Sequence, residues 1–176
     1  RKRPAVIFGS DGIEGCEHSI FEIMSNSIDE AREGYGKKII ITKYLDGSVE
    51  VQDFGRGIPV DYNKNEGKFN WELLFCEMYA GGKYDNGGDN YEFSLGLNGL
   101  GLCATQYASE YMDAEIKSGG YKYTLHFEHG ENVGGLVKEE YKKRGDTGTR
   151  IKWKPDLKVF TDINIPVEYF EETIKR

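Results

Sequence analysis

Hydrophobic residues near the start of the chain recur at the spacing of an α-helix. Within residues 15–33 the apolar positions are Ile20, Phe21, Met24, Ile28 and Ala31. They fall on one side of a helix with about 3.6 residues per turn. Gly34 and Gly36 follow and provide a stop. The pattern predicts an amphipathic helix over residues 15–33.

Strand patterns follow this helix. Two β-branched runs, over residues 38–44 and 48–53, are joined at Asp46-Gly47, the strongest short-range signal of a β-hairpin. Farther along, apolar and polar residues alternate in segments separated by turn glycines, as in antiparallel strands with one buried face. The segments predicted to form an antiparallel meander are residues 112–117, 121–129, 136–141 and 149–154.

Loops and shorter helices complete the predicted elements. A loop is expected over residues 63–69, and helices are expected over residues 71–79, 100–109 and 167–175. Between them lies a glycine-rich stretch, residues 81–101, with no strand or helix pattern. About twenty residues of this kind in a compact domain indicate either a functional lid or a disordered segment.

The composition fits one compact domain. The chain has 176 residues, 38% hydrophobic and 30% charged, enough for one sizeable core. We predict a single domain over residues 1–176 with an α+β fold, a two-layer sandwich whose mixed, mostly antiparallel sheet is covered by helices on one face. A formal charge of -7 argues against a stand-alone nucleic-acid clamp.

Other features bear on the compartment and the chain length. The three cysteines lack metal-site spacing, so we expect free thiols in a reducing cytosol. No apolar run approaches the roughly 20 residues that span a bilayer, and no signal peptide is visible. The sequence therefore predicts a cytoplasmic protein without membrane contact. Because it starts at Arg1 rather than Met, we expect a fragment of a longer chain.

The first helix carries a candidate site on its polar face. Glu22, Asn26, Asp29 and Glu30 share this face. A solvated face is the simplest interpretation, but Asn26 is a poor helix former there. Its neutral oxygen suits a hard cation such as Mg²⁺, which takes one or two protein ligands and completes its shell with phosphates and waters. Glu22, one turn earlier, can hold an attacking water.

A second candidate is the loop that begins at Asp53. Asp-Phe-Gly also occurs in protein kinases, but the other kinase motifs do not precede Asp53. A buried Asp beside a nucleobase accepts from an exocyclic amine and so selects adenine, and Gly55 and Gly57 leave space for a flat ring. The alternative is an ordinary turn at the end of a strand, where Asp and Gly are common.

A third candidate is the glycine-rich segment over residues 96–101, which leads into a helix. It matches neither the dinucleotide-binding fingerprint nor a Walker A loop. Glycines before a helix N-terminus nevertheless present free N–H groups to an anion, so phosphate binding is predicted. Packing alone is the alternative.

The three features occur in a distinctive order along the chain. A helix with Glu-x-x-x-Asn precedes a strand ending in Asp-x-Gly-x-Gly and then a stretch that closes on Gly-x-x-Gly-x-Gly. This order resembles the Bergerat-type ATP-binding fold of gyrase, heat-shock protein 90, MutL and sensor histidine kinases. More specifically, the ATPase domain of bacterial gyrase B or its topoisomerase IV counterpart resembles the segments FEIMSNSIDEA, VQDFGRGIP, YAGGKYD, LGLNGLG and DTGTRIKW. The similarity covers almost the whole chain.

The resemblance implies roles for the matched residues. Glu22 would be the general base that polarises water, and Asn26 would coordinate a Mg²⁺ bridging the phosphates of ATP. Asp53 would accept from the adenine amine, with Thr149 supporting it through a water, and Asp29 would line the pocket. The other implied ATP-binding residues are Glu30, paired with Arg56, then Gly57, Ile58 and Pro59, the lid residues Lys83 and Tyr91, and the phosphate-binding Leu97, Asn98, Gly99, Leu100 and Gly101.

The resemblance also implies partners. The full enzyme would use ATP to drive DNA strand passage and supercoiling together with a gyrase A-like partner. It would dimerise through an N-terminal arm on ATP binding, and competitive inhibitors could take the ATP site. The arm and the transducer domain of the family are not matched by these residues, so slow turnover by this chain alone is expected.

Several positions depart from the family pattern. Leu95 and Asn98 replace a Gly and a His of the lid motif, and Glu92 replaces a basic residue. Ser118 stands where many members carry an Arg that binds aminocoumarins, so we expect weak aminocoumarin binding. Part of a topoisomerase IV, or a gyrase-like nucleotide-binding module with impaired hydrolysis, stays open as an alternative. A histidine-kinase domain is disfavoured, because the Asp-Thr-Gly-Thr strand fits gyrase better.

Overall fold

The computed structural model describes residues 10–77 and 101–175 of the chain. The helices in this part are α2 (Ile13–Arg32), α3 (Asn70–Phe75), α5 (Gly101–Tyr107) and α6 (Val167–Lys175). The strands are β1 (Ile39–Lys43), β2 (Val49–Asp53), β3 (Tyr62–Asn63), β4 (Lys68–Phe69), β5 (Ser109–Ser118), β6 (Tyr121–Glu128), β7 (Glu131–Glu140) and β8 (Gly148–Pro155).

Six of these strands form one sheet in the order β1-β2-β8-β5-β6-β7. Every neighbouring pair in the sheet is antiparallel, so the parallel pairing of a mixed sheet does not occur in the described part. The predicted meander is correct for β5, β6 and β7 and wrong for β8, which returns across the sheet to pair with β5 and β2. This return brings the start of β8 beside the end of β2, where Arg150 pairs with Gln52.

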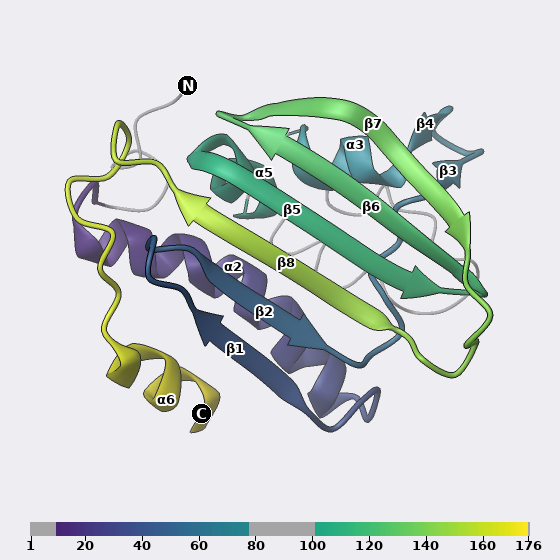
Figure 1. Ribbon diagram of the computed structural model, residues 1–176, viewed down its shortest axis with the longest axis horizontal. Helices are drawn as coiled ribbons and strands as arrows, with labels where there is room; N and C mark the ends of the chain where they lie inside the picture. Colours follow the sequence, from purple (N-terminus) through teal and green to yellow (C-terminus); the bar gives the residue numbers. More distant parts are fainter. Residues whose placement is uncertain (1–9, 78–100, 176) are drawn as a thin grey trace.

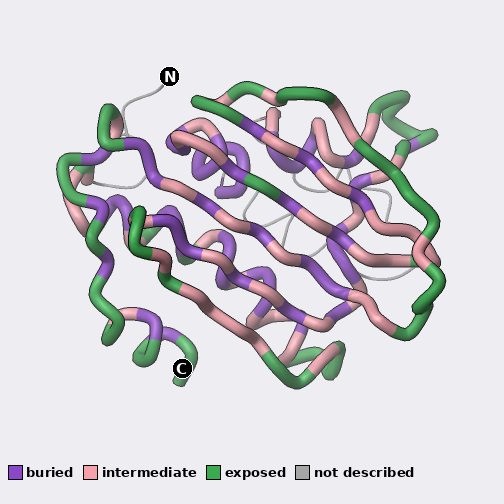
Figure 2. The backbone as a smooth tube through the Cα atoms, in the orientation of Figure 1, coloured by how far each residue is buried: buried purple, intermediate pink, exposed green. Residues whose placement is uncertain are grey.

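The sheet and the helices form two layers. Helices α2, α3 and α5 cover one face of the sheet (Figure 1). Because side chains alternate along a strand, Val49, Val51 and Asp53 of β2 are buried beneath this layer. Figure 2 shows buried positions concentrated in α2, α5 and the central strands, while the edge strand β7 is largely exposed. The predicted α+β two-layer architecture is confirmed.

The core lies between these layers. Its largest fully buried side chains include Trp153 of β8, Phe127 of β6 and Ile20 of α2. Helix α6, at the edge of the molecule, is tied to α2 through the Tyr169 hydroxyl, which donates to the carbonyl of Glu17 over 3.1 Å. The site described below lies on the helical side of the sheet, at the end of β2.

Two predicted segments differ from the structure. The predicted loop over residues 63–69 contains the short antiparallel strands β3 and β4. Asn63 closes the turn between them, since its Oδ1 accepts from the backbone N–H groups of Asn65 and Glu66. The helix predicted over residues 71–79 ends at Phe75, and residues 78–100 lie outside the described part.

The cysteines are free thiols, as predicted. Burial raises the pKa of the Cys16 and Cys76 thiols to about 12, so both stay protonated and unreactive at neutral pH. Among the described residues, no helix has the length and apolar character needed to cross a membrane.

Candidate functional site

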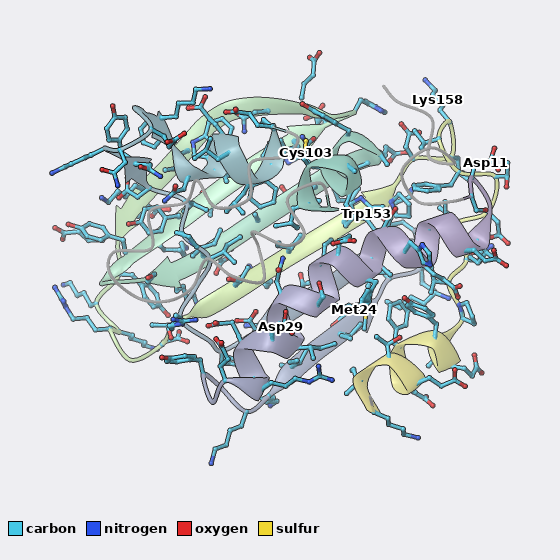
Figure 3. The ribbon with its side chains drawn as sticks, turned by 180° about the vertical axis from the view of Figure 1, so that it is seen from behind. Asp11, Met24, Asp29, Cys103, Trp153 and Lys158 are labelled. Carbon is cyan, nitrogen blue, oxygen red and sulfur yellow. The ribbon has the colours of Figure 1, made fainter. Side chains whose placement is uncertain are left out.

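The polar face of α2 is turned into the molecule. Asn26 is 8% exposed and Glu30 is 3% exposed, and Glu22 and Asp29 are half-buried. The alternative of a solvated helix face is therefore wrong. Helix α2 packs against β2, β8 and α5, and Figure 3 shows it from the helical side, with the labelled Met24 and Asp29 along it and the strands behind. The site is built from these four elements.

Asp53, the last residue of β2, is held by three hydrogen bonds. Its Oδ1 accepts from the backbone N–H groups of Gly55 and Thr149, at 3.0 and 3.2 Å. Its Oδ2 accepts from the Ser27 hydroxyl of α2 at 2.6 Å. Burial raises the pKa of the Asp53 carboxyl, while these hydrogen bonds to its ionised form oppose the rise. Asp53 is a buried, oriented hydrogen-bond acceptor.

Glu30 and Arg56 form a two-pronged ion pair beside Asp53. The Arg56 guanidinium donates to both carboxylate oxygens of Glu30, at 2.6 and 3.2 Å, and the Arg56 backbone N–H donates to the same carboxylate at 2.9 Å. The Tyr35 ring lies 3.9 Å from the guanidinium carbon. The pairing of Arg56 with Glu30 expected from the sequence is confirmed, and the pair fixes the loop after β2 against α2.

The start of β8 fixes the same loop from the other side. The Thr149 hydroxyl accepts from the Ile58 backbone N–H at 2.9 Å, and the Thr147 hydroxyl donates to the Gly55 carbonyl at 2.6 Å. Thr149 thus binds Asp53 directly through its backbone N–H, whereas a water bridge was expected. Gly57 has a φ of +86°. A Cβ on it would lie 2.9 Å from Ile116 and 3.0 Å from the Lys117 carbonyl, so only glycine fits there.

Glu22 and Asn26 lie where α2 meets the start of α5. The Asn26 amide donates to the Glu22 carbonyl at 3.2 Å. A Cβ on Gly101, the first residue of α5, would lie 2.0 Å from Oε2 of Glu22. The missing side chain of Gly101 therefore leaves room for the Glu22 carboxylate. Burial raises the pKa of this carboxylate, with partial opposition from His18.

The residues fit a cation shared with phosphates. Asn26 Oδ1 is buried and accepts no hydrogen bond from any described residue. Such an atom costs free energy unless a ligand satisfies it. Within residues 10–77 and 101–175, no group of three or more His, Cys, Asp and Glu side chains could hold a metal ion by itself. A cation at Asn26 would need phosphate oxygens and waters, which is how Mg²⁺ binds with nucleotides.

Most of the residues predicted for the site cluster at the meeting of α2, β2, β8 and α5. Those linked by the contacts above are Glu22, Asn26, Glu30, Asp53, Arg56, Gly57, Ile58, Gly101 and Thr149. Pro59 follows them on the same loop and is half-buried. Those outside the described residues are Lys83, Tyr91, Leu97, Asn98, Gly99 and Leu100.

Sequence reasoning missed three residues of the site, which are Ser27, Tyr35 and Thr147. A signal for Ser27 exists, because it lies three and four positions after Met24 and Ile23 on the buried stripe of the helix. A hydroxyl on such a stripe needs a partner. Tyr35 and Thr147 carry no such signal, since their contacts depend on how distant segments pack.

Comparison with known proteins identifies the class of this fold and site. Residues 12–159 match the family of histidine kinase-, DNA gyrase B- and HSP90-like ATPases. The match spans most of the chain, so the chain belongs to this family. The ATPase fold of the family implies ATP binding.

Particular relatives narrow this class. The chain is 35% identical over 175 residues to gyrase B of Thermotoga maritima, covering 99% of this chain and 27% of the relative. It is 40% identical over 161 residues to the B protein of DNA topoisomerase 4 of Staphylococcus aureus, covering 91% and 24%. The chain thus spans about a quarter of the length of these relatives.

A solved structure shows the same fold. The crystal structure of the 43K ATPase domain of Thermus thermophilus gyrase B, in complex with an aminocoumarin, superposes with a TM-score of 0.78 at 32% identity. The superposition covers 97% of this chain and 42% of that one. The chain is therefore similar to the ATPase region of gyrase B and of its topoisomerase IV counterpart.

Proposed function

We propose that this chain binds ATP with Mg²⁺ and supplies the ATP-hydrolysing domain of a bacterial type II DNA topoisomerase. Its similarity to gyrase B and to the topoisomerase IV counterpart supports this proposal. A gyrase is our first assignment and topoisomerase IV is the alternative. In the full enzyme, ATP would drive DNA strand passage together with a gyrase A-like partner, and ATP binding would close a dimer through an N-terminal arm.

The state of Asp53 is the observation that carries the proposal. A buried carboxylate at the end of a strand, with three donors already bound, is arranged to accept from a ligand. The exocyclic amine of adenine is such a donor, while guanine presents a carbonyl oxygen at that position. The neighbouring loop, held by Glu30 and Thr149, would border the purine ring.

The phosphates would extend from Asp53 towards Asn26 and Gly101. Asn26 Oδ1 would bind the Mg²⁺, and backbone N–H groups near Gly101 would bind phosphate oxygens. Bound Mg²⁺ supplies positive charge that neutralises the phosphate oxygens. Glu22 would hold the attacking water and accept its proton on a carboxylate oxygen. The raised pKa of Glu22 lies closer to neutral pH, where a general base is more effective.

Calorimetric titration tests the proposal. A non-hydrolysable ATP analogue should bind saturably, more tightly with Mg²⁺ than without it and more tightly than the corresponding GTP analogue. Asp53→Asn places an amide where the adenine amine needs an acceptor. We expect it to weaken ATP binding at least about tenfold, the effect of losing a hydrogen bond to a charged group.

Asp113→Asn is the matched control. Asp113 is exposed on β5, in register with Lys152 and His126 on the face of the sheet away from the helices. The same chemical change there should leave nucleotide binding unaltered. Equal affinity of the wild-type chain for the ATP and GTP analogues, or full binding by folded Asp53→Asn, would refute an adenine site at Asp53.

A further inference from the structure

Three serines on α2 make different hydrogen bonds. The Ser19 hydroxyl donates to the Gly15 carbonyl at 2.9 Å, and the Ser25 hydroxyl donates to the Glu22 carbonyl at 3.2 Å. Both are bonds within the helix, the usual arrangement for a helical serine. The Ser27 hydroxyl instead donates across to β2, to Oδ2 of Asp53, at 2.6 Å. Ser27 is 4% exposed, so water does not compete for this bond.

The bond from Ser27 limits what Asp53 can accept. An ionised carboxylate offers about four acceptor positions, two on each oxygen. The N–H groups of Gly55 and Thr149 take the positions on Oδ1, and Ser27 takes one position on Oδ2. A single acceptor position is left, on Oδ2. A ligand can satisfy it with one donor hydrogen.

We propose that Ser27 is a positioning residue that sets the base selectivity of the nucleotide site by orienting Asp53 as an acceptor for one N–H group. The inference rests on the proposed ATP site and assigns Ser27 a role within it. Adenine supplies this N–H from its exocyclic amine. A purine without the amine supplies nothing, and guanine would place a carbonyl oxygen against the Asp53 carboxylate.

The charges around Asp53 explain why its third donor matters. Burial and the nearby Glu30 carboxylate both raise the pKa of Asp53, and the Ser27 hydrogen bond is the largest of the contacts that lower it. Arg56 is paired with Glu30 rather than with Asp53. Without Ser27, a proton on Oδ2 becomes more favourable. A protonated Oδ2 donates where the amine also donates, so selectivity for the amine is lost.

The experiment compares two nucleotides that differ only in the exocyclic amine. These are the β,γ-imido analogues of ATP and of purine riboside triphosphate, titrated with Mg²⁺ into wild-type, Ser27→Ala and Ser19→Ala chains. We expect the wild-type chain to prefer the ATP analogue by at least about tenfold. Ser27→Ala should lose about tenfold in affinity for the ATP analogue and change less than about twofold towards the other. Ser19→Ala removes a buried hydroxyl from the same helix and should keep both affinities.

Each outcome decides a separate question. A Ser27→Ala chain that keeps the wild-type ratio, or loses affinity for both nucleotides equally, would overturn the role of Ser27 and leave the ATP site standing. A wild-type chain with no preference for the amine would overturn the adenine site itself. Ser27→Cys fills the same space with a weak donor. It should also lose the preference, which keeps the test decisive if Ser27→Ala does not fold.

Discussion

Glu22 illustrates, at the scale of one residue, how a functional group lowers stability. Its folded-state pKa lies above the ordinary value of 4.5 because the carboxyl is partly buried. The folded chain therefore favours the protonated form. The ionised carboxylate costs free energy of unfolding at pH values above the folded-state pKa, and this cost disappears as the pH falls below 4.5.

Glu22→Gln should separate stability from hydrolysis. At pH 7 we expect the free energy of unfolding to rise by about 0.5–1 kcal/mol, as is common when a functional site is neutralised. The gain should vanish near pH 4, where Glu22 is already protonated in both states. The full-length enzyme should bind ATP normally and hydrolyse it at least about 100-fold more slowly. Urea unfolding at the two pH values and a steady-state ATPase assay measure these effects.

Glu14→Gln is the control for this prediction. Glu14 is exposed in the first turn of α2, where its charge suits the helix dipole. Its neutralisation should give no gain in stability at pH 7 and no change in hydrolysis. A Glu22→Gln chain that is no more stable than wild type at pH 7 would contradict a burial cost at this position.

At the scale of elements, the start of β8 depends on one glycine. Gly148 is buried and has a φ of +146°. A Cβ there would lie 2.1 Å from the Asp53 carbonyl oxygen and 2.9 Å from its carbon. Backbone atoms cannot rotate away as a flexible side chain can. Gly148 therefore lets β8 approach β2 closely enough for the Thr149 N–H to reach Asp53.

Gly148→Ala should separate these two strands locally. We expect it to lower the free energy of unfolding by about 2–4 kcal/mol, because backbone strain and a steric clash act together. Gly145→Ala is the matched control in the preceding loop, since no atom lies within 4 Å of a Cβ there. Its effect should stay within about 0.5 kcal/mol. Equal urea midpoints for the two variants would show that β8 does not depend on this close approach.

Local patterns predicted the elements more reliably than their arrangement. Helix α2, the β1-β2 hairpin and α6 follow from apolar spacing and from Asp46-Gly47, which act over a few residues. The place of β8 between β2 and β5 depends on contacts between distant segments, which no short pattern encodes. The candidate site is affected in the same way. The polar face of α2 was visible in the sequence, but the bonds from Ser27 and Thr147 depend on the packing of distant segments.

At the scale of the whole molecule, the two tryptophans report on opposite parts of the core. Trp71 of α3 lies 6.3 Å from the Phe127 ring of β6, measured between ring centroids. Trp153 of β8 donates from its indole N–H to the Thr105 carbonyl of α5 at 2.9 Å. Both pack with one continuous cluster of buried residues. A single cluster of this kind predicts one cooperative domain.

Urea unfolding of Trp71→Phe and Trp153→Phe tests this prediction, because each variant keeps one tryptophan as a fluorescent probe. In each variant, fluorescence and far-UV circular dichroism should give the same midpoint. A saturating Mg-ATP analogue should raise the midpoints from both probes together, since a ligand that binds only the folded state stabilises the whole cooperative unit. Should the remaining Trp71 lose its native signal at lower urea than the backbone does, α3 would unfold separately, and the core would hold two units instead of one.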